Sequence, residues 1–316
     1  MIKEKNKGII RLCGDVIFKS VFLKEKDILL KMIYDITGIK ETSFYEEIIP
    51  GYELETSKID GKVNRCDLLV KIGDKYFINV ELNYLHEKSV LYRNMMQLFR
   101  ISIQITESGM TDKELSNKHI GQLNFNTFSN NNNKEILKGY YQDEEGNKLN
   151  DLLTFWNIDI VKCYKKVYNN IEDVQKLPKE VRWGALLYVD VHDIGMIEKI
   201  IGDDLLTMEE RTKLIASITD VIDNTRILQD WMIEENARMK QKGQLDYARE
   251  EGLAQGIEEG RKKGIKEGIK EGIKEGAEEK NKEVIVNMLR MNMDYNIISQ
   301  VTGENIEKIK KIEDSI

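Results

Sequence analysis

The stretch NRCDLLVKIGDKYFINVELN, residues 64–83, reads as two β-strands joined by a three-residue turn, Gly-Asp-Lys at 73–75. In the register that this turn sets, Asp67 lies directly opposite Glu81 on one face of the hairpin. The other face is apolar or aromatic throughout, which predicts burial in a core: Leu68, Val70, Ile72, Tyr76, Ile78, Val80 and Leu82. We therefore expect a carboxylate pair beside a hydrophobic core.

The carboxylate pair favours a metal site. Two anions opposed at roughly 5 Å repel by on the order of 3 kcal/mol at an effective dielectric constant near 20, so a cation is expected to relieve the repulsion. Asn83 lies on the same face, and Leu82 offers its backbone carbonyl. This all-oxygen set suits Mg²⁺ or Mn²⁺. The alternative is that Asp67 and Glu81 are two solvated charges on the outer face of the hairpin.

The segment after the hairpin has helical periodicity. One polar stripe lies on this helix, at Arg93, Gln97, Arg100 and Gln104, beside an apolar stripe that is expected to be buried, at Leu91, Met95, Leu98, Ile101 and Ile105. Because the helix starts within a few residues of Glu81, its polar stripe could contact a phosphate held at the carboxylate pair. The alternative is a solvated helix face.

Helices are predicted over residues 8–38, with a break near Glu25 and a C-cap at Gly38. Asp15 follows a glycine at the start of the first helix, where it could serve as an N-cap. Farther along the chain, a strand is expected near residues 119–128. The segment LLTFWNIDIVKCY, residues 152–164, reads as one more strand.

The order of these motifs resembles the PD-(D/E)XK nuclease superfamily, and most closely its bacterial recombination-promoting nuclease and transposase family. The resemblance runs over nearly the whole chain and is carried by GDVIFKSVF (14–22), RCDLLV (65–70), NVELN (79–83), YRNMMQLF (92–99) and FWNIDIVKCYKK (155–166). It implies a restriction-endonuclease-like α/β fold, with a mixed sheet flanked by helices and an all-α C-terminal extension. It also implies a metal-dependent DNA endonuclease.

The resemblance implies a role for each site residue. Mg²⁺, or Mn²⁺, would be held by Asp67 and Glu81 with help from Asp15, and Asn83 would orient the attacking water. The DNA would be bound by the polar stripe, that is by Arg93, Gln97 and Arg100. The third active-site position departs from the pattern: the family usually has Gln and the superfamily Lys, whereas Asn83 is shorter than either and carries no charge. The alternative is a catalytically impaired DNA-binding or oligomerising protein that retains the nuclease fold.

Composition bounds these expectations. With 316 residues, 41% of them hydrophobic, the chain can form one core of about 200 residues and a smaller appendage. The net charge of -7 argues mildly against nucleic-acid binding. Three cysteines, which form neither a CxxC motif nor an even set, predict a reducing, cytoplasmic compartment, and Cys66 is expected to be buried on the side of Leu68. The histidines form no ligand set, and no membrane or secretory segment is evident.

The sequence divides into four parts. We expect a nuclease-like domain at 1–200, a helical extension at 201–250, a charged repeat at 251–283 and a short helix-turn-helix-like unit at 284–316. Within the repeat, glycine recurs every four residues from Gly252 to Gly276. This spacing is consistent with close helix contacts in a homo-oligomer, or with a flexible linker, because each glycine costs a helix roughly 1 kcal/mol relative to alanine.

Overall fold

The computed structural model describes residues 9–40, 46–54, 64–84, 89–106, 110–129, 134–150 and 152–316. Its contacts divide the chain into two units, residues 1–239 and residues 240–316. Within the part of the chain that the structure describes, no helix is long and apolar enough to cross a lipid bilayer.

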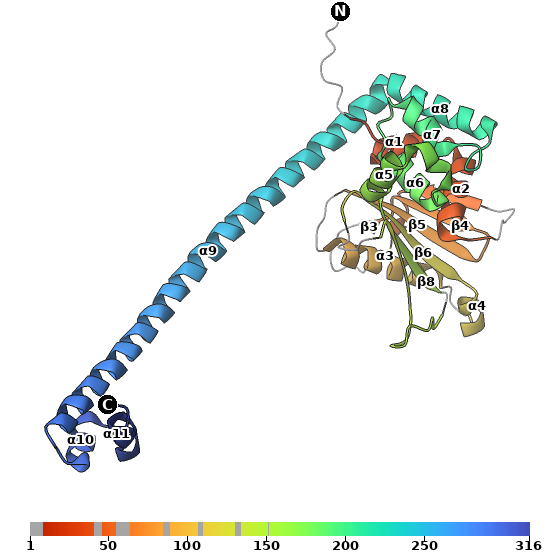
Figure 1. Ribbon diagram of the computed structural model, residues 1–316. Helices are drawn as coiled ribbons and strands as arrows, with labels where there is room; N and C mark the ends of the chain where they lie inside the picture. Colours follow the sequence, from red (N-terminus) through yellow and green to blue (C-terminus); the bar gives the residue numbers. More distant parts are fainter. Residues whose placement is uncertain are drawn as a thin grey trace, which may run out of the picture. The chain divides into compact units, whose positions relative to one another are not determined.

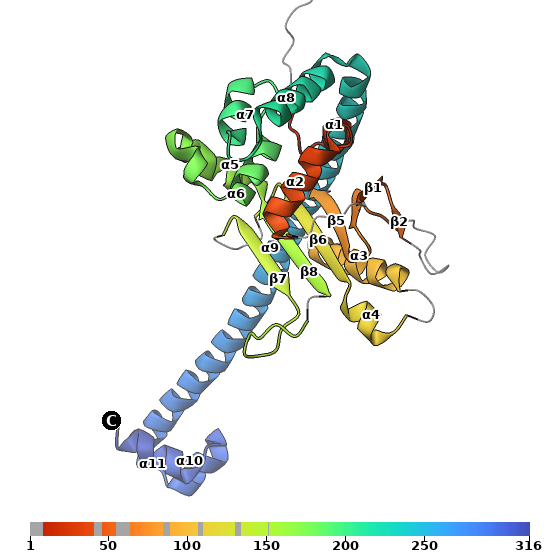
Figure 2. The ribbon, with the colours of Figure 1, turned by 90° about the vertical axis from the view of Figure 1, so that its right-hand side faces the viewer.

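Among the described residues of the first unit, six strands form one mixed sheet (Figures 1 and 2). Their order is β1 (Glu46–Pro50), β4 (Leu68–Ile72), β5 (Tyr76–Asn83), β6 (His119–Asn126), β8 (Leu153–Asp159) and β7 (Ile136–Tyr140). The strands β5, β6 and β8 run parallel, and the remaining neighbours pair antiparallel. A separate two-stranded pair consists of β2 (Glu53–Leu54) and β3 (Asn64–Arg65). The predicted α/β class with a mixed sheet is confirmed.

The predicted hairpin register is confirmed. Leu68 pairs with Val80 and Ile72 pairs with Tyr76, so the turn between β4 and β5 covers residues 73–75. Gly73 adopts a φ of 57°, a left-handed conformation that glycine reaches without a steric cost. This turn sets which residues of the two strands face each other.

Helices cover both faces of the sheet. The apolar hairpin face joins the main core, which is built with α1 (Asp15–Phe22), α2 (Lys26–Thr37), α5 (Ile160–Asn169), α6 (Lys179–Tyr188), α7 (Ile194–Ile201) and α8 (Met208–Asp223). The opposite face packs on α3 (Ser89–Ile105), where Leu98 and Ile101 form a buried apolar cluster with Leu69 and Phe77 of the sheet. The short helix α4 (Asp112–Ser116) precedes β6, and the 3₁₀ helix η1 (Ile171–Lys176) follows α5. The carboxylate face of the hairpin is therefore covered by α3.

The predicted break in the N-terminal helices is confirmed, since α1 ends at Phe22 and α2 begins at Lys26. The predicted C-cap is also confirmed. Gly38 has a φ of 75° and its N–H donates to the carbonyl of Tyr34. This is the left-handed helix end that glycine favours.

Two predictions about strands are wrong. The strand expected over residues 152–164 ends at Asp159, because the Asp159 side chain accepts a hydrogen bond from the backbone N–H of Lys162 and so begins α5. Cys66 is buried, but on the α3 side and not on the side of Leu68. The chain bends at Asp67, and the N–H of Cys66 donates to the carbonyl of Tyr52 in place of the hairpin partner.

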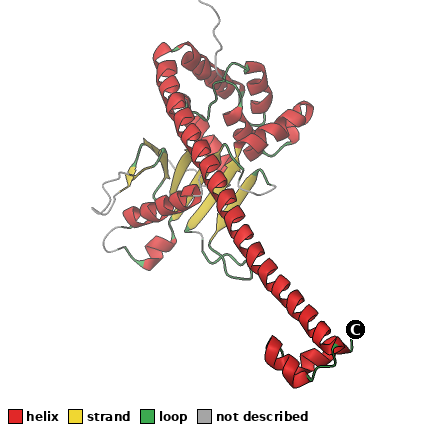
Figure 3. Cartoon of the chain, turned by 90° about the vertical axis from the view of Figure 1, so that its left-hand side faces the viewer, coloured by secondary structure: helices red, strands yellow, loops and turns green. Residues whose placement is uncertain are grey.

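The second unit contains the greater part of α9 (Thr225–Arg290), together with α10 (Tyr295–Thr302) and α11 (Ile306–Glu313) (Figure 3). A small apolar cluster of Ile285, Ile298, Ile309 and Ile312 joins the end of α9 to α10 and α11. The glycines from Gly252 to Gly276 all lie within α9, and a side chain added at any of them would meet open space. The repeat is thus helical in the structure.

Candidate functional site

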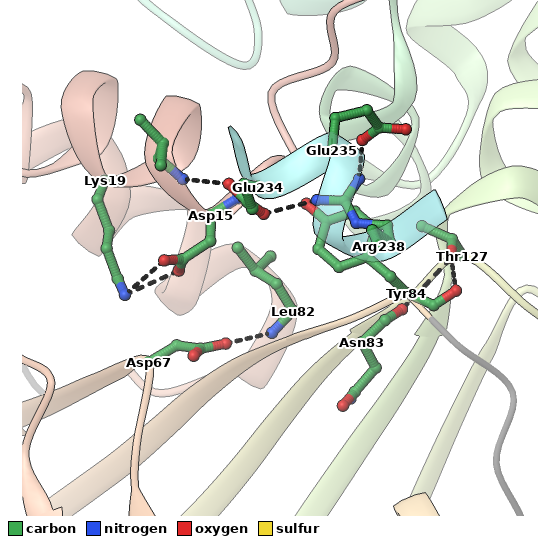
Figure 4. Close-up of polar contacts among 11 residues, drawn as sticks. Asp15, Lys19, Asp67, Leu82, Asn83, Tyr84, Thr127, Glu234, Glu235 and Arg238 are labelled. Atoms are coloured by element: carbon green, nitrogen blue, oxygen red, sulfur yellow. Dashed lines mark hydrogen bonds and ion pairs between the residues drawn. The ribbon is translucent and has the colours of Figure 1, made fainter. Parts of the chain in front are cut away.

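At the open end of the hairpin, the carboxylates of Asp67 and Glu81 each accept a hydrogen bond from the backbone of the neighbouring strand segment. Glu81 Oε1 accepts a hydrogen bond of 3.2 Å from the N–H of Asp67. In turn, Asp67 Oδ2 accepts a bond of 2.9 Å from the N–H of Leu82 (Figure 4). The predicted pairing therefore brings the two carboxylates together, with Glu81 buried and Asp67 half-buried.

Burial raises the pKa of both carboxyl groups. For Glu81 the loss of hydration is the largest cause, and the charge of Asp67 raises its pKa further. For Asp67 burial also dominates, the N–H of Leu82 acts in the opposite direction, and the charge of Asp15 raises the pKa. Arg93 lowers both pKa values by its positive charge. The pair binds a proton more tightly than free carboxylates do, and a cation placed beside it would relieve the same cost.

Two amide side chains hold Glu81 in place. Asn79 Nδ2 and Gln97 Nε2 each donate to Glu81 Oε1 at 3.2 Å. Gln97 is buried at the α3–sheet contact, although its position in a polar stripe made it a candidate DNA ligand. The expected apolar stripe on α3 is wrong at Met95, which is 45% exposed, because the helix turns Gln97 and its neighbours toward the sheet.

Asn83 lies two residues beyond Glu81 and is also buried. Its Oδ1 accepts a bond of 2.8 Å from Arg93 of α3, and its Nδ2 donates to Asn126 of β6 at 3.0 Å. Arg93 is exposed. Arg100 is half-buried two turns farther along α3, and it takes part in none of the described hydrogen bonds of the carboxylate pair. The structure therefore joins Arg93, but not Arg100, to the site.

A buried network of amides extends from Glu81 across the sheet. Asn79 donates to Gln122, Gln122 to Asn124, and Asn124 to Asn157, with Asn94 of α3 also donating to Asn124. Gln122, Asn124 and Asn126 were missed in the sequence, although their alternation in the strand GQLNFN places them on one face. They lie opposite Asn79, Glu81 and Asn83 in the parallel register. This alternation of polar residues is the sequence signal from which the amide network on β6 could have been predicted.

Asp15 lies on the side of the pair that faces α1. It is the first residue of α1 and does not cap the helix with its own side chain, and its carboxylate pairs with Lys19 at 2.8 Å. The carboxylate of Glu234, from α9, accepts hydrogen bonds from the N–H groups of Asp15 and Val16 instead (Figure 4). This contact joins residues more than 200 positions apart, so nothing local in the sequence predicts it.

Arg238 lies one turn beyond Glu234 on α9. Its guanidinium pairs with Glu234 at 2.6 Å and with Glu235 at 2.5 Å, and it stacks on the ring of Tyr84 at 3.6 Å. Tyr84 follows Asn83 directly, and Thr127 donates to its carbonyl at 2.8 Å. The start of α9 is thus packed against the end of β5, beside the carboxylate site.

The residues present fit Mg²⁺ better than zinc. Among the described residues, no three His, Cys, Asp or Glu side chains converge into a metal site. Mg²⁺ is commonly held by one or two carboxylates and keeps several waters, so the pair Asp67 and Glu81 is sufficient for it. Asn79 Oδ1 and Gln97 Oε1 are buried beside the pair with no hydrogen-bond partner among the described residues. These oxygens could accept hydrogen bonds from the waters of such an ion.

Comparisons of this chain with protein-family models, with curated proteins and with solved structures gave no match.

Proposed function

We propose that this protein is a Mg²⁺-dependent DNA endonuclease with a restriction-endonuclease-like fold. The observation that carries the proposal is the carboxylate pair, in which Glu81 accepts from the N–H of Asp67 and Asp67 accepts from the N–H of Leu82. Because the pKa values of both carboxyl groups are raised, their ionised forms are unfavourable in the folded protein, and a divalent cation bound beside them would offset that cost. The mixed sheet, with the pair just before β4 and near the end of β5 and a helix covering this face, supports the same proposal.

In this mechanism Asp67 and Glu81 hold the ion. When bound, Mg²⁺ makes water a stronger nucleophile and offsets the negative charge that develops on the phosphate. Arg93, exposed at the start of α3, binds the phosphate of the DNA backbone. Asn83 is a positioning residue, since its Oδ1 accepts the bond that holds the Arg93 guanidinium. Asp15 acts on Asp67 by its charge, which raises the pKa of Asp67.

The test is cleavage of supercoiled plasmid by the full chain with Mg²⁺ or with a chelator. Asp67→Asn and Glu81→Gln each remove a charge without changing shape, and we expect each to abolish Mg²⁺-dependent nicking. Asp74→Asn is the matched control, because Asp74 is an exposed carboxylate in the turn of the same hairpin. Cleavage by Glu81→Gln at the wild-type rate would remove the pair from the mechanism.

A second function is favoured by the contacts of Asn83. Both ends of its amide are engaged, by Arg93 and by Asn126, and it brings no positive charge to the position where the superfamily has lysine. The chain would then be a DNA-binding protein that keeps the nuclease fold without cleaving. Asn83→Gln and Asn83→Lys decide between the two: if these variants and the wild type bind DNA but none cleaves it with Mg²⁺ or Mn²⁺, the binding function stands.

We also propose that α9 mediates self-association. Exposed apolar side chains follow the glycines of the repeat, with Ile265, Ile269 and Ile273 between 50% and 69% exposed. A glycine surface lets two helices approach closely, and the isoleucines beside it would be buried by a second copy. Sedimentation of the full chain tests this, since Ile265→Lys together with Ile269→Lys should convert an oligomer to a monomer. A monomeric wild type would refute it.

A further inference from the structure

A cavity of about 400 Å³ lies at the other end of β5 from the carboxylate pair. Tyr76 and Ile78 of β5 line it, together with Trp156 of β8 and the segment that follows α2. Ile78 and Trp156 belong to the main core, so the cavity opens on the sheet face opposite to α3. Five residues of extended strand separate Tyr76 from Glu81, which is roughly 17 Å. This cavity is a separate site.

Positive charge gathers around this cavity. Its lining includes Lys40, Lys75, Lys138 and Lys148, and no Asp or Glu is among the described residues that line it. The chain as a whole carries a net charge of -7, so this local excess does not follow from composition.

Aromatic rings support the lysines. The Lys138 ammonium lies 5.3 Å from the centre of the Trp156 ring, and the Lys75 ammonium lies 5.1 Å from that of Tyr76. The Tyr76 ring in turn stacks on His119, with 5.0 Å between their centres. Such cation–π contacts hold flexible lysine side chains at the cavity. Because these lysine side chains are already held in place, less of their conformational entropy is lost when an anionic ligand binds.

We propose that this cavity binds a phosphate-bearing small molecule of about nucleotide size. Lysine ammonium groups are common phosphate ligands, acting as point charges. The volume lies within the range of small-molecule sites, which runs from about 300 to 1,000 Å³. The cavity is too small to hold a duplex inside it, whereas it has room for one phosphorylated nucleoside. The site is independent of the proposed nuclease function.

Calorimetry on the full chain tests the proposal with three probes: ADP, inorganic phosphate and uncharged adenosine. We expect a phosphate-bearing probe to bind, adenosine not to bind, and affinity to fall with added salt. Lys40→Gln and Lys138→Gln should each weaken binding at least tenfold. Lys113→Gln, an exposed lysine of α4, is the matched control and should bind as the wild type does.

The probes separate the sources of the phosphate. Tighter binding of ADP than of inorganic phosphate supports a nucleotide ligand. Equal binding of the two, or binding of neither, would overturn a ligand of nucleotide size. Binding that is unchanged in both Lys40→Gln and Lys138→Gln, or that adenosine reproduces, would overturn the proposal. Asp67→Asn should leave ADP binding intact, so failure of the nuclease proposal would not affect this outcome.

Discussion

Removing the charge of Glu81 should make the protein more stable at high pH. Burial, with the neighbouring charge of Asp67, raises the pKa of Glu81 from 4.5 to about 8. The folded protein therefore holds a proton on Glu81 that the unfolded chain releases. This proton stabilises the fold below pH 4.5, and the stabilisation is lost as the pH rises through 8.

The expected gain in unfolding free energy follows from the size of the pKa shift of Glu81. A tenfold change in an ionisation equilibrium is worth about 1.4 kcal/mol, so ionising Glu81 in the folded protein costs at most about 5 kcal/mol. Glu81→Gln avoids that cost and keeps an oxygen that can accept from Asn79, Gln97 and the Asp67 N–H. For the first unit, residues 1–239, this difference corresponds to a Tm that is higher in Glu81→Gln than in the wild type by on the order of 10 °C at high pH.

Urea unfolding of wild type and Glu81→Gln across this pH range measures the difference. The two curves should coincide at low pH and separate as the pH rises. Mg²⁺ should stabilise the wild type at high pH, where the carboxylate is free to bind it, and should have a much smaller effect on Glu81→Gln. A stability difference that stays constant over the whole pH range would refute the reasoning, because it would mean that Glu81 ionises normally in the folded protein.

Further substitutions test the packing around the site. Glu234→Ala should cost about 1–2 kcal/mol of unfolding free energy by removing the acceptor at the start of α1; an equal loss in Glu235→Ala, which pairs with Arg238, would assign the effect to the ion pairs of Arg238 instead. Gly184→Ala should cost about 1–3 kcal/mol, because a new Cβ would lie 2.8 Å from the sulfur of Cys163 between α6 and α5; unchanged urea unfolding would show that the helices can move apart. Gly268→Ala meets open space and should raise the helical stability of α9 by roughly 1 kcal/mol, read from thermal loss of circular dichroism; a less stable helix would mean that the glycine is needed.

The local features of the fold could be predicted from the sequence. The turn at 73–75 sets the hairpin register because strand pairing through a short turn leaves one alignment, and the apolar alternation then decides which face is buried. Gly38 marks the end of α2 for a similar local reason. These signals reach over a few residues, and they were sufficient to pair Asp67 with Glu81.

The partners of the pair could not be predicted in the same way. Asn94, Asn124 and Asn157 come from three separate elements, and an asparagine in isolation more often indicates a turn than a buried network. The parallel register between β6 and β8 places Asn124 opposite Asn157, and no turn sets that register. Gln97 was predicted to bind DNA as part of a polar stripe, and only the sheet beneath α3 shows that its side chain is buried.

The strand order has a consequence for how the protein folds. The hairpin β4–β5 pairs residues a few positions apart, whereas β5 pairs with β6 across 43 residues, as for Tyr76 and His119. A hairpin forms in roughly 1–10 μs, but parallel pairing has to wait until a long loop has closed. Asp67 and Glu81 therefore meet early, in a hairpin that is still hydrated, and at that stage both can ionise normally. The docking of β6 and α3 comes later and forces the pair to take up a proton or a cation, so the last steps of folding should slow as the pH rises.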